Sequence, residues 1–349
     1  MRYLLPLFCL LMVACSSSDE SVTPVPDVPK SSFYVVNQGS FYDGIDGSIS
    51  AVNTETGIVI PDAFMAQNGV SIGGTPQGAA KYGDNLYVPA FESGIVWALN
   101  AENLSVTGTI STPTPQAVAA TADYLFVANN DGNLSVFDRN SLQLVEKIPV
   151  GPNPYSLALL GDELFISISD GYNYPTYENG LRLARFSTTD FSRGEDIPVG
   201  LNPGQLIAAE SGKLVVVCSG NYADVPSKVY SVNPATGESA YICDGSFIAV
   251  NGNDLLVIHS VTDWTTYETV TTYNLYDVNS GALKRENLLS GDLPTAPINV
   301  QFDADGNIYV LADPSAAEYN MPGYVYRYNA DGTYSTTYHV GVHPYNIIF

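Results

Sequence analysis

The chain has 349 residues, with 36 acidic and 13 basic side chains and a formal net charge of −23 at pH 7. A protein this acidic is repelled by nucleic-acid phosphates, anionic lipid head groups and acidic polysaccharides, because like charges oppose association. The charge therefore excludes these partners and favours neutral or cationic ligands.

The N-terminus has the pattern of an export signal. Arg2 gives a short positive start, and the apolar run from Leu4 to Ala14 is too brief to span a bilayer. Cys15 follows the small residue Ala14, and the segment resembles the signal of bacterial lipoproteins, in which the cysteine is diacylated and the chain is cut before it. We therefore expect residues 1–14 to be removed and Cys15 to carry lipid. The alternative is an ordinary signal peptide followed by a chance cysteine.

Residues 15–31 are expected to form a tether between the lipid and a folded domain. Ser16 to Glu20 is polar and acidic, and it resembles the tag with which gut Bacteroidetes export lipoproteins to the outer surface. Pro24, Pro26 and Pro29 fix the backbone φ and lack amide donors, so this segment should be extended and semi-rigid. The predicted location is the outer membrane, facing the exterior, with the lipid anchor as the contact to the membrane.

Residues 32–349 repeat a unit of strands and turns with a period of about 40 to 50 residues, the interval of four-stranded propeller blades. The second strand of each unit is strongly β-prone, as in Tyr124-Leu125-Phe126-Val127. Each unit starts with a turn that contains Pro or Gly and leads into a short apolar strand. The seven starts are Thr75-Pro76-Gln77, Thr114-Pro115-Gln116, Asn153-Pro154-Tyr155, Asn202-Pro203-Gly204, Asp244-Gly245-Ser246, Ala296-Pro297-Ile298 and His343-Pro344-Tyr345.

The seventh unit is divided between the two ends of the chain. Residues 32–36 have the pattern of a second strand with no first strand before it, and residues 344–349 have that of a first strand with nothing after it. We predict that the C-terminal strand completes the N-terminal blade, because the ring would otherwise keep an unpaired sheet edge. Residues 32–349 thus resemble the YVTN-type, surface-layer-like seven-bladed β-propellers, an all-β fold; a β-sandwich or a β-helix is the alternative.

Two cysteines remain once Cys9 leaves with the signal and Cys15 is lipidated. Cys218 and Cys243 fall on the second and fourth strands of one unit. Non-adjacent strands lie about 9 to 10 Å apart, which is beyond the reach of a disulfide. We therefore expect two buried thiols.

The loops that join second to third strands are long and rich in aromatic residues, whereas the turns between first and second strands are tight. In a propeller these loops share one face with the connections between blades, and binding residues on a rigid scaffold are usually carried by loops. We predict a ligand site on that face, built from aromatic rings and amides. The candidates on the long loops are Gln38, Phe41, Tyr42, Phe91, Asn130, Asp131, Tyr172, Tyr174, Tyr177, Tyr222, Trp264, Tyr267 and Tyr319. The candidates nearer the axis are Gln77, Gln116, Tyr155, Gln205, Phe247, Asn299, His343 and Tyr345.

Catalytic and metal sites are poorly represented. Among the three histidines, His259, His339 and His343, none has metal-ligand spacing with another. The segment from Asp303 to Asn307 looks like part of a calcium loop but lacks the distal Glu, so an Asx turn is expected. No nucleophile motif, P-loop or dinucleotide fingerprint stands out. We therefore expect a protein that is not an enzyme and that uses no metal or cofactor.

The lipoprotein signal, acidic tag, tether and Tyr-rich acidic propeller together resemble the surface lipoproteins that capture cobalamin in gut Bacteroidetes. That resemblance implies delivery of the corrinoid to a TonB-dependent transporter of the outer membrane. It rests on architecture and on the character of one face, because this family has no signature motif to match residue by residue. The alternatives are a scaffold that grips a protein or a glycan, and a lactonase-like or quinoprotein-like propeller enzyme.

Overall fold

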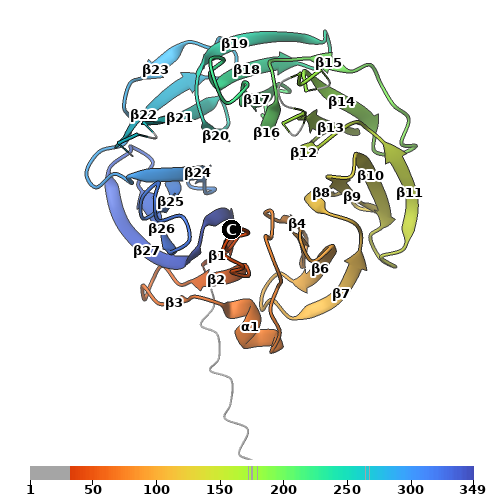
Figure 1. The fold of residues 1–349 in the computed structure, drawn as a ribbon, viewed down its shortest axis with the longest axis horizontal. Coiled ribbons are helices and arrows are strands. Elements are labelled where there is room, and N and C mark those ends of the chain that lie inside the picture. The colour runs from red at the N-terminus through yellow and green to blue at the C-terminus, as the bar shows by residue number, and fades with distance from the viewer. Residues whose placement is uncertain (1–31, 172, 174–175, 179, 264, 267) are drawn as a thin grey trace, which may run out of the picture.

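The computed structural model describes residues 32–349 except 172, 174, 175, 179, 264 and 267. In this part of the chain, seven four-stranded antiparallel sheets form the blades of a ring (Figure 1). The first strand of each blade lies next to the central axis and the fourth lies at the periphery. The predicted all-β, seven-bladed propeller is confirmed.

The first three blades are numbered along the chain, and their strands are given from the axis outward. Blade 1 contains β28 (Pro344–Ile348), β1 (Phe33–Asn37), β2 (Ser48–Val52) and β3 (Val59–Ile60). Blade 2 contains β4 (Ala80–Tyr82), β5 (Asn85–Ala90), β6 (Ile95–Asn100) and β7 (Val106–Ser111). Blade 3 contains β8 (Pro115–Ala120), β9 (Tyr124–Asn129), β10 (Asn133–Asp138) and β11 (Leu144–Pro149).

Blades 4 to 7 follow the same order of strands. Blade 4 contains β12 (Pro154–Leu160), β13 (Glu163–Ile168), β14 (Arg182–Ser187) and β15 (Ile197–Pro198). Blade 5 contains β16 (Pro203–Ala208), β17 (Leu214–Cys218), β18 (Lys228–Asn233) and β19 (Glu238–Asp244). Blade 6 contains β20 (Phe247–Asn251), β21 (Asp254–Asp263), β22 (Glu268–Asp277) and β23 (Leu283–Arg285). Blade 7 contains β24 (Ala296–Phe302), β25 (Ile308–Asp313), β26 (Pro322–Tyr328) and β27 (Tyr334–Val342).

Blade 1 joins the two ends of the chain, as predicted. β28 pairs with β1 in antiparallel register, with Val35 opposite Ile347. From blade 7, the side-chain amide of Gln301 donates to the Ile347 carbonyl and accepts from the Ile347 amide. The ring is therefore closed by a complete β-ladder within blade 1 and by side-chain bonds from blade 7.

The hydrophobic core lies between the blades. In the described part of the chain there are seven apolar clusters, one for each pair of neighbouring blades. Phe126 of blade 3, for example, shares a cluster with Ile166 of blade 4. Each second strand is packed on both faces, so its residues form a continuous apolar run, as in Leu214–Cys218, rather than an alternating one.

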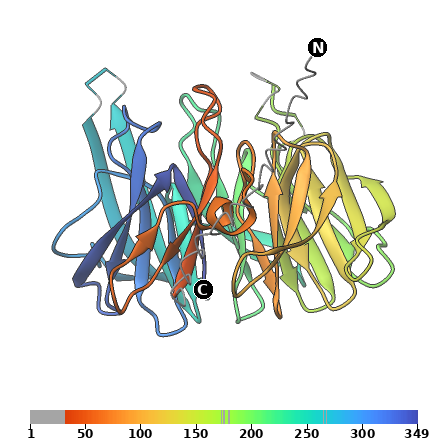
Figure 2. The same ribbon diagram turned by 90° about the horizontal axis from the view of Figure 1, so that it is seen from below.

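The two faces of the ring differ (Figure 2). One, called the loop face, carries the connections between blades and the loops that join second to third strands. The other, the turn face, carries the remaining turns. Ser32 donates its backbone N–H to Val52 at the end of β2, and Lys81 binds the Phe349 carbonyl beside the turn between β4 and β5. Both ends of the described chain therefore lie on the turn face.

Two local features differ from the sequence prediction. The segment His259 to Thr271 was expected to be a loop, but most of it extends β21 and β22 into a long hairpin, because its Val and Thr residues favour strand. A short helix, α1 (Ala63–Asn68), was not predicted; Asp62 caps its first turn and Gly69 ends it in a left-handed conformation. Within the described residues, no helix combines the length and apolar character needed to cross a membrane.

Cys218 and Cys243 are both free and buried, as predicted. Burial in the apolar interior raises the pKa of the Cys218 thiol to about 12 and that of Cys243 to about 11. Neither thiol is appreciably ionised at neutral pH, and both therefore act as small packing groups.

The closure of the ring can be tested at Ile347. Replacing Ile347 by Ala should lower the free energy of unfolding by about 2 to 5 kcal/mol, because it empties space between blades 7 and 1. Urea unfolding measures the effect. The control is Ile58→Ala at an exposed site, and equal losses for the two variants would contradict a special role for β28.

The buried thiols can be tested with a thiol reagent at pH 8, on a chain that starts at residue 32 and so lacks Cys9 and Cys15. Because burial disfavours the thiolate, neither Cys218 nor Cys243 should react in the folded protein, and both should react after unfolding in urea. The labelling is followed by absorbance. Rapid labelling of the native protein would show that the packing of blade 5 against its neighbours is open to the reagent.

Candidate functional site

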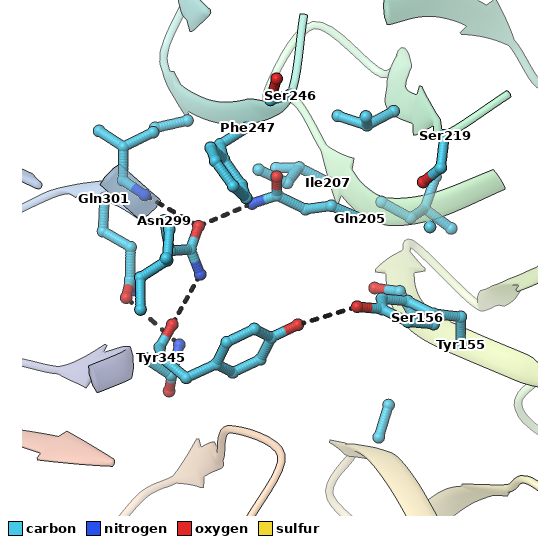
Figure 3. Close-up of a pocket in the computed structure, with 18 of the residues that line it drawn as sticks. Tyr155, Ser156, Gln205, Ile207, Ser219, Ser246, Phe247, Asn299, Gln301 and Tyr345 are labelled. Carbon is cyan, nitrogen blue, oxygen red and sulfur yellow. Dashed lines mark hydrogen bonds between the residues drawn. The ribbon is translucent and has the colours of Figure 1, made fainter. Parts of the chain in front are cut away.

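A cavity of about 480 Å³ opens at the centre of the ring, among the innermost strands (Figure 3). It is called the channel pocket. Its walls come from β8, β12, β16, β20, β24 and β28, so residues far apart in sequence converge on it. Eight residues predicted from the sequence line it: Gln77, Gln116, Tyr155, Gln205, Tyr222, Phe247, Asn299 and Tyr345.

The channel pocket is neutral although the chain carries a net charge of −23. Among the described residues that line it, none has a charged side chain; the polar groups are amides and hydroxyls, and the others are mostly aliphatic or aromatic. Hydroxyl groups come from Ser156, Ser169, Ser219 and Ser246. Such a lining offers hydrogen-bond donors and acceptors together, without the desolvation cost of a charge.

Part of this amide set holds the blades together. Gln205 of blade 5 donates to the Ile248 carbonyl at 2.9 Å and accepts from the Ile248 amide at 3.0 Å, which satisfies the inner edge of blade 6. Asn299 of blade 7 accepts from Gln205 and donates to the Tyr345 carbonyl at 2.7 Å (Figure 3). These side chains have backbone partners, so their first role is structural.

A second group of amides, Gln38, Gln77 and Gln116, is paired only with itself among the described residues. The side-chain oxygen of Gln77, Oε1, accepts from the side-chain amide of Gln38 at 2.8 Å and from that of Gln116 at 3.3 Å. Three glutamines from blades 1, 2 and 3 therefore meet beside the axis. The carbonyl oxygen of Asn346 is buried and, within the described chain, has no hydrogen-bond partner. This side of the pocket retains hydrogen-bonding capacity that a ligand could use.

Two tyrosines cross the channel. The hydroxyls of Tyr155 on blade 4 and Tyr345 on blade 1 lie 3.3 Å apart, and these blades are nearly opposite in the ring (Figure 3). Burial raises the pKa of Tyr345, so its hydroxyl stays protonated at neutral pH and can donate. The pair forms one wall of the channel pocket.

Several of the predicted aromatic residues are exposed on the loops around the pocket. Tyr222 has 70% of its surface exposed, and Phe41 and Tyr42, which contact each other edge to face at 5.3 Å, have 60% and 87% exposed. Tyr319 is also exposed but lines a different cavity, between blades 6 and 7. Tyr222 therefore adds an exposed ring to the lining of the pocket, and Phe41 and Tyr42 provide exposed apolar surface on the loop from β1 to β2.

The structure does not bring the other predicted residues to the pocket. Tyr177 is buried, and its hydroxyl donates to the Asn221 carbonyl, so it packs two loops together. Asp131 forms an ion pair with Lys147 on the outer strand of blade 3. Phe91 and Asn130 are partly buried in short loops and do not line the pocket. Cys15, Tyr172, Tyr174, Trp264 and Tyr267 lie outside the described residues.

The sequence prediction missed part of the lining. Gln301 and Asn346 contribute amides from β24 and β28, and the serines contribute hydroxyls. A usable signal is present in the sequence, because Gln301 and Asn346 are polar side chains within mostly apolar first strands.

Two of the three histidines, His339 and His343, and the Asp303 turn have structural partners. The Nδ1 atom of His343 lies 2.8 Å from Asp313 Oδ2, and His339 packs edge-on against Tyr324. Asp303 accepts from the backbone amides of Asp305 and Asn307, which is the Asx turn predicted. Among the described residues, no group of three or more His, Cys, Asp or Glu side chains is arranged to hold a metal ion.

The connections into the first strands are under backbone strain. The residue before the strand's proline has a positive φ in five blades, a conformation that costs energy for any side chain other than glycine. The residues are Thr75 (51°), Thr114 (41°), Asn153 (45°), Asn202 (54°) and His343 (52°). The same turn therefore leads into the inner side of five of the seven blades.

No protein-family model matches the chain, and no curated protein matches its sequence. Many solved structures resemble it, and three of them are described here. Hydrazine synthase of Kuenenia stuttgartiensis has a TM-score of 0.60 at 17% identity, over 73% of this chain and 77% of that one. A quinoprotein alcohol dehydrogenase-like protein of Bacteroides thetaiotaomicron has a TM-score of 0.64 at 15% identity, over 92% and 78%. The computationally designed protein Ika8 has a TM-score of 0.58 at 11% identity, over 90% of each chain.

These similarities establish the fold, and they correct one expectation. The sequence analysis predicted that the chain is not an enzyme, and this was wrong: two of the three similar propellers are named as an enzyme and as an enzyme-like protein. A propeller of this shape does not exclude catalysis, because one fold hosts many functions. The resemblance to YVTN-type propellers in particular stays a prediction.

Asn202, in one of these turns, allows a test of how the turn is anchored. Its buried side chain accepts from the backbone amide of Asp170 and donates to the backbone carbonyl of Gly220. Asn202→Ala should lower the free energy of unfolding by about 2 to 4 kcal/mol, because two buried backbone groups lose their partners. Chemical denaturation measures the change, with the exposed Asn140→Ala as control. A loss no greater than that of the control would argue against this anchoring role.

Proposed function

We propose that this protein is a surface lipoprotein that captures a corrinoid on its loop face and delivers it to a TonB-dependent transporter of the outer membrane. The observation that carries the proposal is the channel pocket, an amide- and hydroxyl-lined cavity without charged walls in a strongly acidic chain. A corrinoid is a wide ring fringed with amide side chains. Amides and hydroxyls of the pocket are complementary to such a fringe.

The size of the pocket favours a ligand that lies across its mouth. A cavity of about 480 Å³ is suited to a drug-sized molecule, and a corrinoid is larger than that. In this arrangement one amide side chain of the ligand enters the pocket beside Gln77 and Gln116. The ring rests on the exposed aromatic residues Phe41, Tyr42 and Tyr222 of the rim.

The rigidity of the pocket walls supports capture of a ligand. Gln205, Asn299 and Gln301 already hold neighbouring blades together through backbone bonds, so the walls of the pocket are set before a ligand arrives. Preformed walls reduce the entropy lost on binding. The affinity in this proposal comes from many fixed contacts.

The position of the chain ends suits a surface receptor. Ser32 lies on the turn face, and in this proposal the lipid at Cys15 holds the protein with its turn face toward the membrane. The candidate site would then point away from the membrane, toward ligands in the medium. Transfer to a transporter would require the loop face to dock on it, which the exposed loops permit sterically.

Calorimetric titration of the domain with cyanocobalamin tests the proposal. We expect binding with a dissociation constant of about 1 μM or tighter. Gln77→Ala should weaken it by about tenfold, because the glutamine cluster loses its shared acceptor. Gln143→Ala, an exposed glutamine on the turn face, is the matched control and should bind like the wild type.

The outcomes are distinct. No binding of cyanocobalamin at micromolar concentrations would sink the corrinoid assignment. Binding that is unaffected by Gln77→Ala would place the ligand elsewhere on the ring. Recovery of an envelope protein or a glycan in pull-downs, together with no corrinoid binding, would favour the scaffold alternative.

A further inference from the structure

A second cavity of about 490 Å³ lies between blades 6 and 7, apart from the channel pocket. It is called the inter-blade cavity. The β21–β22 hairpin forms one wall, the loop from β25 to β26 forms another, and the start of β24 lies at its base. Of the described residues, Ile298 alone lines both cavities, so the two can be tested separately.

Asp313 is the acidic group of this cavity. Its side chain is only 5% exposed, and it sits at the end of β25. One oxygen, Oδ2, lies 2.8 Å from His343 Nδ1, whereas Oδ1 is buried and has no hydrogen-bond partner in the described chain. An unpaired buried carboxylate oxygen is costly, so this atom is the strongest sign of a missing donor.

His343 holds the carboxylate in place. The residue is confined by its positive φ of 52° and by Pro344, which begins β28. Burial raises the pKa of Asp313, and the contact with His343 offsets only part of that rise. With Oδ2 bonded to His343, Oδ1 is the oxygen of this cavity-lining carboxylate that still lacks a hydrogen-bond donor among the described residues.

The remaining walls suit a small molecule with an aliphatic body. Hydroxyls of the hairpin form cross-strand pairs, with Thr262 and Thr269 2.9 Å apart and Ser260 next to them on the same face. The opposite side is formed by Ala316 and its neighbours, and Pro297 lies at the base. Among the described lining residues there is no Lys or Arg to neutralise Asp313.

We propose that the inter-blade cavity binds a primary amine on a short aliphatic chain. The ammonium group donates to Asp313 Oδ1 and supplies the charge that the cavity lacks. The alkyl body packs against Ala316 and Pro297, and the threonine hydroxyls accept the remaining ammonium hydrogens. The strongly acidic chain also favours the approach of a cation.

The probe for this site is n-butylammonium chloride, with n-butanol and sodium butyrate as neutral and anionic analogues of equal length. Ligand-observed NMR titration of the wild-type protein should show saturable binding of butylammonium, at least about tenfold tighter than butanol, and none of butyrate. Equal binding of the amine and the alcohol, or no saturable binding of the amine, overturns the proposal. The unpaired oxygen would then simply be hydrated.

Two variants locate the site. Asp313→Asn keeps the shape and an acceptor for His343 but removes the charge, and it should weaken butylammonium at least about tenfold. Asp305→Asn, an exposed acid on the turn face, changes the net charge equally and should bind like the wild type. If Asp313→Asn fails to fold, Ala316→Leu fills the cavity without touching the carboxylate and should abolish binding. Unchanged binding in Ala316→Leu rules the site out, and cyanocobalamin affinity should be unaffected in each variant.

Discussion

Face-to-face packing of apolar blades is the interaction on which the whole molecule depends. Each blade buries both of its faces against its neighbours, so no blade has a core of its own, and the described clusters each join two sheets. Such packing requires a closed ring, because an open one would expose two apolar faces. The pairing of β28 with β1 supplies that closure and makes blade 1 dependent on both ends of the chain.

Closure also creates the channel pocket. Seven innermost strands converge on one axis and leave backbone edges there that need hydrogen-bond partners. Gln205 and Gln301 satisfy two of these edges by bonding both backbone groups of a residue in the next blade. Amides near the axis thus have two origins: some complete the sheets, and others, such as Gln77 and Gln116, remain available at the mouth. A list of polar residues near the axis cannot separate the two kinds.

The inter-blade cavity follows from irregularity in the repeat. β21 and β22 extend well beyond the other strands of blade 6, and the loop from β25 to β26 of blade 7 stands beside them. The space between them is lined by the carboxylate of Asp313. His343 contacts one oxygen of this carboxylate, and the other has no hydrogen-bond partner among the described residues. A perfectly regular propeller would have no such space, so differences between blades are where additional binding capacity arises.

The sequence alone was sufficient for the blades, the divided blade 1 and the free thiols, because these depend on local β-propensity, turn residues and spacing that recur along the chain. It also identified the residues after the strand-starting prolines as axial, since five of the seven blades are entered through the same turn. It could not distinguish the buried Tyr177 from the exposed Tyr222, or show that Gln205 is committed to Ile248 while Gln77 is not. Those distinctions depend on contacts between blades separated by tens of residues, and only the tertiary structure decides which side chains meet there.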